Sequence, residues 1–63
     1  MTLKKWIDTV GQAEAARTLG ITRQRIHYWY HGKARPSFKA MHLIIEKSDN
    51  KVTARDLLSD FLK

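Results

Sequence analysis

QAEAARTLGITRQRIHYWYH, residues 12–31 of this 63-residue chain, contains two short helical patterns separated by a Gly-Ile-Thr turn. Three alanines and Leu19 favour a first helix, and Gly20 ends it after about two turns. Thr22 is a good N-cap for a second helix that continues to the next glycine, Gly32. Neither helix contains proline. The stretch therefore predicts two helices that cross at a tight turn.

The order of residue types in this unit is that of a helix-turn-helix of the DNA-binding kind. A small residue in the first helix allows a close crossing, a glycine suits the positive φ of the turn, and three apolar residues bury the inner faces. These positions are Ala16, Gly20, Ile21, Ile26 and Trp29. The competing interpretation is an ordinary pair of helices that has this spacing by chance.

The second helix of the unit has two unlike faces. At 100° per residue, Ile26, Trp29 and Tyr30 point inward together. The outer side is polar and basic, and it carries Arg23, Gln24, Arg25, His27, Tyr28 and His31. Such a helix can present short donors and acceptors to the base edges in a major groove.

Each outer side chain has a predicted role if the helix enters the groove with its N-terminus first. Arg23 can pair with guanine, Gln24 with adenine, and His27 can donate to guanine or a phosphate. Contacts to phosphates or thymine methyl groups are predicted for Thr22, Arg25, Tyr28 and His31. Further phosphate contacts are predicted for Gln12 and Arg17 in the preceding helix and for Lys33 and Arg35 beyond it.

Three more helices are predicted around this unit. Thr2 precedes an apolar stripe of helical period over 3–10, and Pro36 and Ser37 precede another. Thr53 and Asp56 resemble a capping box before the last helix. The apolar positions are Leu3, Trp6, Ile7 and Val10, then Phe38, Met41, Ile44 and Ile45, then Leu57, Leu58, Phe61 and Leu62. The prediction is an all-α domain, 1–63, of five short helices around a helix-turn-helix.

An α+β fold is the alternative. β-branched residues flank Asp49 and Asn50, which are able to turn a hairpin within residues 43–56. Helix is preferred because a strand through 51–57 alternates poorly, whereas the later leucines and Phe61 form a face only on a helix.

Charge points to a polyanionic partner. Twelve Lys and Arg oppose six Asp and Glu, a net charge of +6, and residues 1–35 carry most of the excess. Nucleic acid is the leading candidate and an anionic membrane surface the second. With no cysteine, no long apolar run and no signal-peptide core, the protein is expected to be cytoplasmic.

Other kinds of site are not favoured. His27 and His31 lie four apart, but no Cys, Asp or Glu lies near them in sequence to complete a metal shell. Tyr28 is the one aromatic ring on the outer face, too few for a platform that stacks single-stranded bases. No Ser-His-Asp grouping, phosphate loop or carboxylate pair is found. We therefore expect no enzyme activity, metal, cofactor or small-molecule substrate.

Two segments, TLGITRQRI and VTARDLLSDFL, together resemble the Cro-type repressors of lambdoid phages and the related YdaS-like group, over nearly the whole chain. Trp29 near the end of the third helix, a helix led by Pro36 and the segment IIEKSDN belong to the same resemblance. It implies a lambda-repressor-like DNA-binding domain that acts as a transcriptional repressor. It also implies base reading at Arg23, Gln24, His27 and Tyr28.

We accordingly predict a homodimer that binds a short pseudo-palindromic operator in a bacterial cytoplasm or a phage-infected cell. One short helix reads only a few base pairs, so two half-sites about 34 Å apart multiply specificity. Candidates for the dimer surface, or equally for the core, are Phe38, Leu58, Phe61 and Leu62. Two alternatives are an excisionase-like architectural protein that bends DNA and an antitoxin-like adaptor that binds protein.

Overall fold

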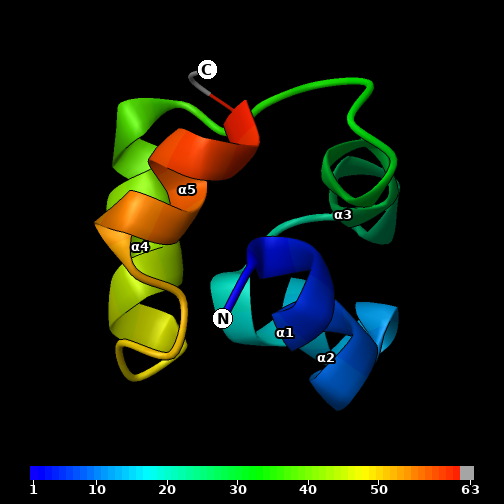
Figure 1. Cartoon of the computed structure of the whole chain (residues 1–63). Helices are drawn as coiled ribbons and strands as arrows, with labels where there is room; N and C mark the ends of the chain where they lie inside the picture. Colours follow the sequence, from blue (N-terminus) through cyan, green and yellow to red (C-terminus); the bar gives the residue numbers. More distant parts are fainter. Residues whose placement is uncertain (62–63) are drawn as a thin grey trace.

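A computed structural model describes residues 1–61 of the chain, which form five helices and no strand (Figure 1). The helices are α1 (Leu3–Val10), α2 (Gln12–Leu19), α3 (Arg23–Tyr30), α4 (Phe38–Lys47) and α5 (Ala54–Phe61). The predicted all-α class and the number of helices are confirmed. None of the described helices is long and apolar enough to cross a membrane.

Polar side chains begin the helices where the sequence predicts them. The hydroxyls of Thr2, Thr22 and Ser37 each accept a hydrogen bond from the backbone N–H three residues later, at 3.1–3.2 Å. Thr53 and Asp56 form the predicted capping box, because each side chain accepts from the backbone N–H of the other. Each cap satisfies an N–H that the helix itself leaves without a partner.

Left-handed residues end α2 and α3. Gly20 has φ 68° and Gly32 has φ 69°. After α2, the N–H groups of Gly20 and Ile21 donate to the carbonyls of Arg17 and Ala16, the paired bonds of a Schellman motif. The same pair of bonds follows α3 around Gly32. Glycine suits both positions because a Cβ disfavours positive φ.

The segment after α4 is a third turn of this kind and not a hairpin, so the α+β alternative is wrong for the described residues. Asp49 and Asn50 do have positive φ, 57° and 63°, as a two-residue hairpin turn requires. Their N–H groups, however, donate back to Glu46 and Ile45 of α4. The buried Ser48 accepts from the Val52 N–H at 3.1 Å, which closes the turn without a partner strand.

One core joins all five helices. α2 packs against α1, α3 and α4, while α5 packs against α1 and α4. In Figure 1, α4 and α5 lie together on one side of the molecule, and a long connection leads to α4 from the far end of α3. The buried apolar residues are Leu3, Trp6, Ile7, Ala15, Ala16, Leu19, Ile26, Trp29, Met41, Ile44, Val52 and Leu57.

Some predicted apolar positions lie outside this core. Phe38 is 76 % exposed and Leu58 is 51 % exposed. Phe38 is the first residue of α4, so it lies beyond the part of the helix that Met41 and Ile44 anchor. Phe61 is half-buried, and Leu62 lies outside the described residues. Within the described chain, Phe38 and Leu58 are therefore surface residues.

Candidate nucleic-acid interface

The two faces of α3 separate as the helical period predicts. Ile26 is fully buried and Trp29 is 6 % exposed, so this side anchors the helix to the domain. The opposite side is exposed and carries Arg23, Gln24, Arg25, His27, Tyr28 and, just after the helix, His31. The first turn of α3 contains no acidic residue. An anion can therefore approach this end of the helix without repulsion from a carboxylate in that turn.

Tyr30 only partly follows the prediction that it faces inward. Its ring is half-buried, and its hydroxyl donates to the carboxylate of Asp8 on α1 at 2.7 Å. This bond stabilises the neutral phenol, and it raises the pKa of Tyr30 with smaller contributions from desolvation and the Asp8 charge. The ammonium of Lys4 lies 5.1 Å from the ring centroid. Tyr30 thus ties α1 to α3 at the rim of the exposed face.

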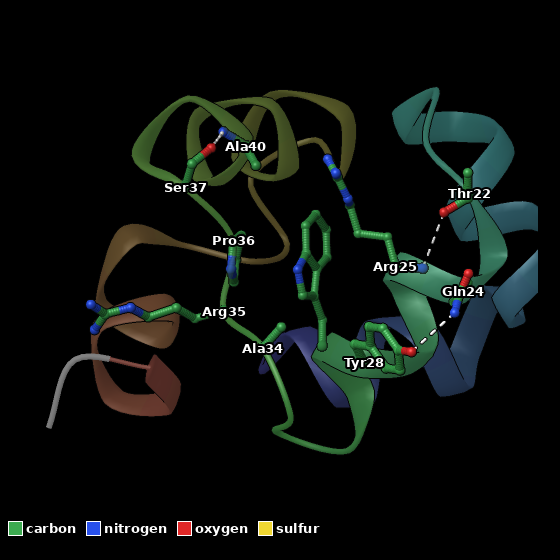
Figure 2. A pocket seen from close by; sticks show the side chains of 10 residues that line it. Thr22, Gln24, Arg25, Tyr28, Ala34, Arg35, Pro36, Ser37 and Ala40 are labelled. Atoms are coloured by element: carbon green, nitrogen blue, oxygen red, sulfur yellow. Dashed lines mark hydrogen bonds between the residues drawn. The ribbon is translucent and has the colours of Figure 1, made fainter.

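Gln24 and Tyr28 form a hydrogen-bonded pair on the exposed face. The Gln24 amide nitrogen donates to the Tyr28 hydroxyl at 3.0 Å (Figure 2). One N–H and the carbonyl oxygen of Gln24 remain available, and these are the groups that pair with adenine in a major groove. Tyr28 therefore orients Gln24, an interaction that helical spacing permits but residue type alone does not reveal.

Thr22 and Arg25 lie at the N-terminal end of α3. The Thr22 hydroxyl oxygen accepts from the Arg25 backbone N–H, so it serves as the helix cap and keeps its own proton to donate. The Arg25 side chain extends towards the start of α4 (Figure 2). Arg25 thus points from α3 towards α4.

A hollow lies between α3 and the start of α4 and has a volume of about 550 Å³. Its lining residues are Thr22, Gln24, Arg25, Tyr28, Trp29, Ala34, Arg35, Pro36, Ser37 and Ala40. Arg25 enters it from α3, whereas Arg35 lines its edge at the connection and its side chain extends away from Arg25 (Figure 2). The Arg25 guanidinium therefore lies at one concave surface beside the exposed face of α3, and a guanidinium there suits an anion.

Lys39 is a basic residue that the sequence analysis did not select. It shares a second hollow, of about 410 Å³, with Arg25 and the partly buried Ile21 and Leu43. Lys39 is in the first turn of α4, two residues after the cap Ser37. The sequence around Lys39 does not show that it lies near Arg25, because the placement of α4 beside α3 depends on the path of the connection between them.

The residues selected on α2 are less free for an anion than those on α3. Arg17 pairs with Glu14 at 3.4 Å, although both side chains are largely exposed. Gln12 begins α2 directly after Gly11, and α2 has no side-chain cap. Its first N–H groups are therefore not satisfied by a side chain, but Glu14 places a negative charge in the same turn.

Nine of the eleven selected residues come from α3, the hollow and the connection, and two come from α2. Thr22, Arg23, Gln24, Arg25, His27, Tyr28 and His31 come from α3 and its two ends, and Arg35 comes from the hollow. Lys33 follows in the connection and is exposed. Gln12 and Arg17 belong to α2.

Within the described residues, no three His, Asp or Glu side chains form a group that could hold a metal ion. Comparison of the chain with models of protein families, with curated proteins and with solved structures gives no match.

Proposed function

We propose that the protein is a sequence-specific transcriptional repressor that binds double-stranded DNA through a helix-turn-helix formed by α2 and α3. The homodimer occupies a short pseudo-palindromic operator, in the manner of the Cro-type repressors that the sequence resembles. Occupying an operator that overlaps a promoter is sufficient for repression, and no cofactor is needed.

The observation that carries this proposal is the sidedness of α3. A short helix is anchored by Ile26 and Trp29, and its opposite face holds polar and basic groups with no acidic residue in the first turn. Arg23, Gln24 and His27 are the side chains for base edges. Arg or Lys on guanine and Gln on adenine are the pairings that major-groove geometry favours, and each good bidentate contact contributes about 1–3 kcal/mol of discrimination.

Phosphate contacts come from the flanks of that face. Arg25 and Arg35 at the hollow, with Lys33 in the connection, suit the backbone on one side of the groove. Thr22 can donate its free hydroxyl proton, and His31 lies at the end of α3. Contacts from Gln12 and Arg17 at α2 are weaker in this proposal, because Glu14 lies between them. These contacts fix the register and contribute no sequence discrimination.

In this proposal the dimer interface is formed by α4 and α5 and not by α3. Phe38 and Leu58 are exposed apolar side chains on these two helices, which pack against each other. Burying these two side chains against a second copy removes their apolar surface from water. A second copy related by two-fold symmetry covers both residues and leaves both α3 faces free.

Equilibrium binding to duplex DNA tests the proposal. We expect affinity to fall steeply with salt, because several phosphates are neutralised. With an operator-like duplex and a scrambled duplex, Arg23→Ala and Gln24→Ala reduce the ratio of the two affinities. Lys33→Ala, the matched basic control outside the reading face, weakens both equally.

Three outcomes contradict parts of this model. Uniform weakening by all three variants removes base reading from Arg23 and Gln24. Affinity that is insensitive to salt favours the protein-binding adaptor. Tandem binding with a large bend, and no symmetric pair, favours the excisionase-like architecture.

A further inference from the structure

His27 and His31 form a pair of imidazoles at the C-terminal end of α3. Their ring centroids are 4.3 Å apart, and both residues are exposed. A helix brings positions i and i+4 to the same side, and here the two rings lie at an angle of 58°. Helical spacing therefore holds two imidazoles, each with ring nitrogens able to bind a cation, side by side on the exposed surface.

The spacing fits one transition-metal ion. Such an ion binds imidazole nitrogen at about 2.0–2.1 Å, so a single ion can reach one nitrogen of each ring at this separation. Imidazole suits Zn²⁺, Cu²⁺ and Ni²⁺, whereas Mg²⁺ and Ca²⁺ prefer oxygen ligands. Two ligands on one helix bind as a chelate, because after the first contact the second ring is already at high effective concentration.

The surroundings of the pair define what kind of site this is. Arg23 lies one turn before His27, and the Lys4 ammonium sits over Tyr30, whose ring is 5.1 Å from that of His31. Both cations oppose a metal ion. Asp8 already accepts the Tyr30 hydroxyl. A metal ion held by His27 and His31 therefore has two protein ligands and keeps water in its other positions, so its binding is reversible.

We propose that His27 and His31 form a two-imidazole binding site for a borderline divalent cation of the Zn²⁺, Ni²⁺ and Cu²⁺ class. The site is a property of the free protein and does not depend on DNA binding. If the protein is the repressor proposed above, a bound metal ion takes up a ring nitrogen of His27, and this nitrogen can then no longer donate to a base edge.

Titration of the whole chain with NiCl₂ tests the site. Paramagnetic broadening of the imidazole C–H signals in proton NMR reports which histidines bind, and calorimetry gives the affinity. We expect His27 and His31 to broaden first, and His42, a solitary exposed histidine on α4, to broaden last. His27→Gln and His31→Gln each lower the affinity for Ni²⁺ by about 100-fold through loss of the chelate. His42→Gln has no effect.

Circular dichroism establishes that each variant folds, which is expected because all three residues are exposed. An excess of ZnCl₂ displaces Ni²⁺ from the wild-type protein, and the same concentration of MgCl₂ does not. Equal broadening of the three histidines, or unchanged Ni²⁺ affinity in His27→Gln, overturns the site. Because no DNA is present, neither result bears on the proposed repressor.

Discussion

Replacing Tyr28 by Phe removes one oxygen atom from the exposed face of α3 and tests how Gln24 is positioned. That oxygen accepts the hydrogen bond from the Gln24 amide at 3.0 Å, while the ring that packs along the helix is kept. An exposed hydrogen bond of this kind contributes about 0.5–1 kcal/mol. The free energy of unfolding is therefore expected to change by no more than about 1 kcal/mol.

The effect on DNA discrimination follows from the same bond. Without the Tyr28 hydroxyl, the Gln24 amide samples several rotamers, and in the proposed complex with DNA it must be ordered when it meets adenine. Ordering one such side chain costs about 0.5–1.5 kcal/mol, which corresponds to a 2- to 12-fold loss of preference at one base pair. Gln24→Ala loses the contact itself, about 1–3 kcal/mol.

Fluorescence anisotropy on duplexes that differ only at that base pair measures the effect, and a double-mutant cycle isolates it. Tyr28→Phe is expected to reduce discrimination in the wild-type background and to have no effect in the Gln24→Ala background. An equal loss in both backgrounds, or an equal loss on every duplex, refutes the positioning role of Tyr28.

Three further predictions concern stability. Ile26→Ala removes a fully buried side chain and is expected to lower the free energy of unfolding in urea by about 2–5 kcal/mol, so a loss below about 1 kcal/mol contradicts its place in the core. Gly32→Ala costs about 1–2 kcal/mol from φ 69° alone, since a Cβ there meets no atom within 4 Å, and Gly32→Asn costs less because Asn tolerates this conformation; equal losses for both variants contradict the backbone explanation. The Thr53 N–H, and then the terminal amine, hold the pKa of Asp56 below its ordinary value, so this stabilisation is present above the ordinary aspartate pKa and is lost as the pH falls through the lowered one. Thermal unfolding at about pH 6 and about pH 3 is therefore expected to show a smaller acid-induced loss in Asp56→Asn than in the wild type, and an unchanged loss contradicts the capping box.

Local signals were sufficient to predict most of the fold. The caps at Thr2, Thr22, Ser37 and Thr53 each depend on residues three positions apart, which a sequence displays directly. The same holds for the inner face of α3, since Ile26 and Trp29 follow the helical period. Helix bounds and the buried side of each helix follow from such short-range relations.

The segment 48–53 shows where local signals are ambiguous. Two residues with positive φ are common to a hairpin turn and to a helix that ends in a Schellman motif. The choice depends on whether their N–H groups find a partner strand or the last turn of α4. Here Asn50 donates to Ile45, and Val52 is drawn fully into the core. That burial was not predicted, because it results from packing between distant elements.

In the candidate site, too, some features follow from the local sequence and others depend on how distant elements pack. Exposure of Arg23, Gln24 and His27 follows from the helical period. The hollow that Arg25 enters and Arg35 lines depends on the path of the α3–α4 connection, and the sequence does not specify this path. Glu14 near Arg17 was visible in the sequence, but only the structure shows that the two side chains form an ion pair at 3.4 Å.

The decisive measurement is selection of bound sites from a pool of random DNA duplexes, followed by sequencing of the enriched fraction. A repressor that reads DNA with one α3 from each protomer enriches a two-fold symmetric motif, with half-site centres about 34 Å apart, or about ten base pairs. Enrichment of a motif without symmetry contradicts the dimeric repressor. Failure to enrich any motif contradicts sequence reading by α3 altogether.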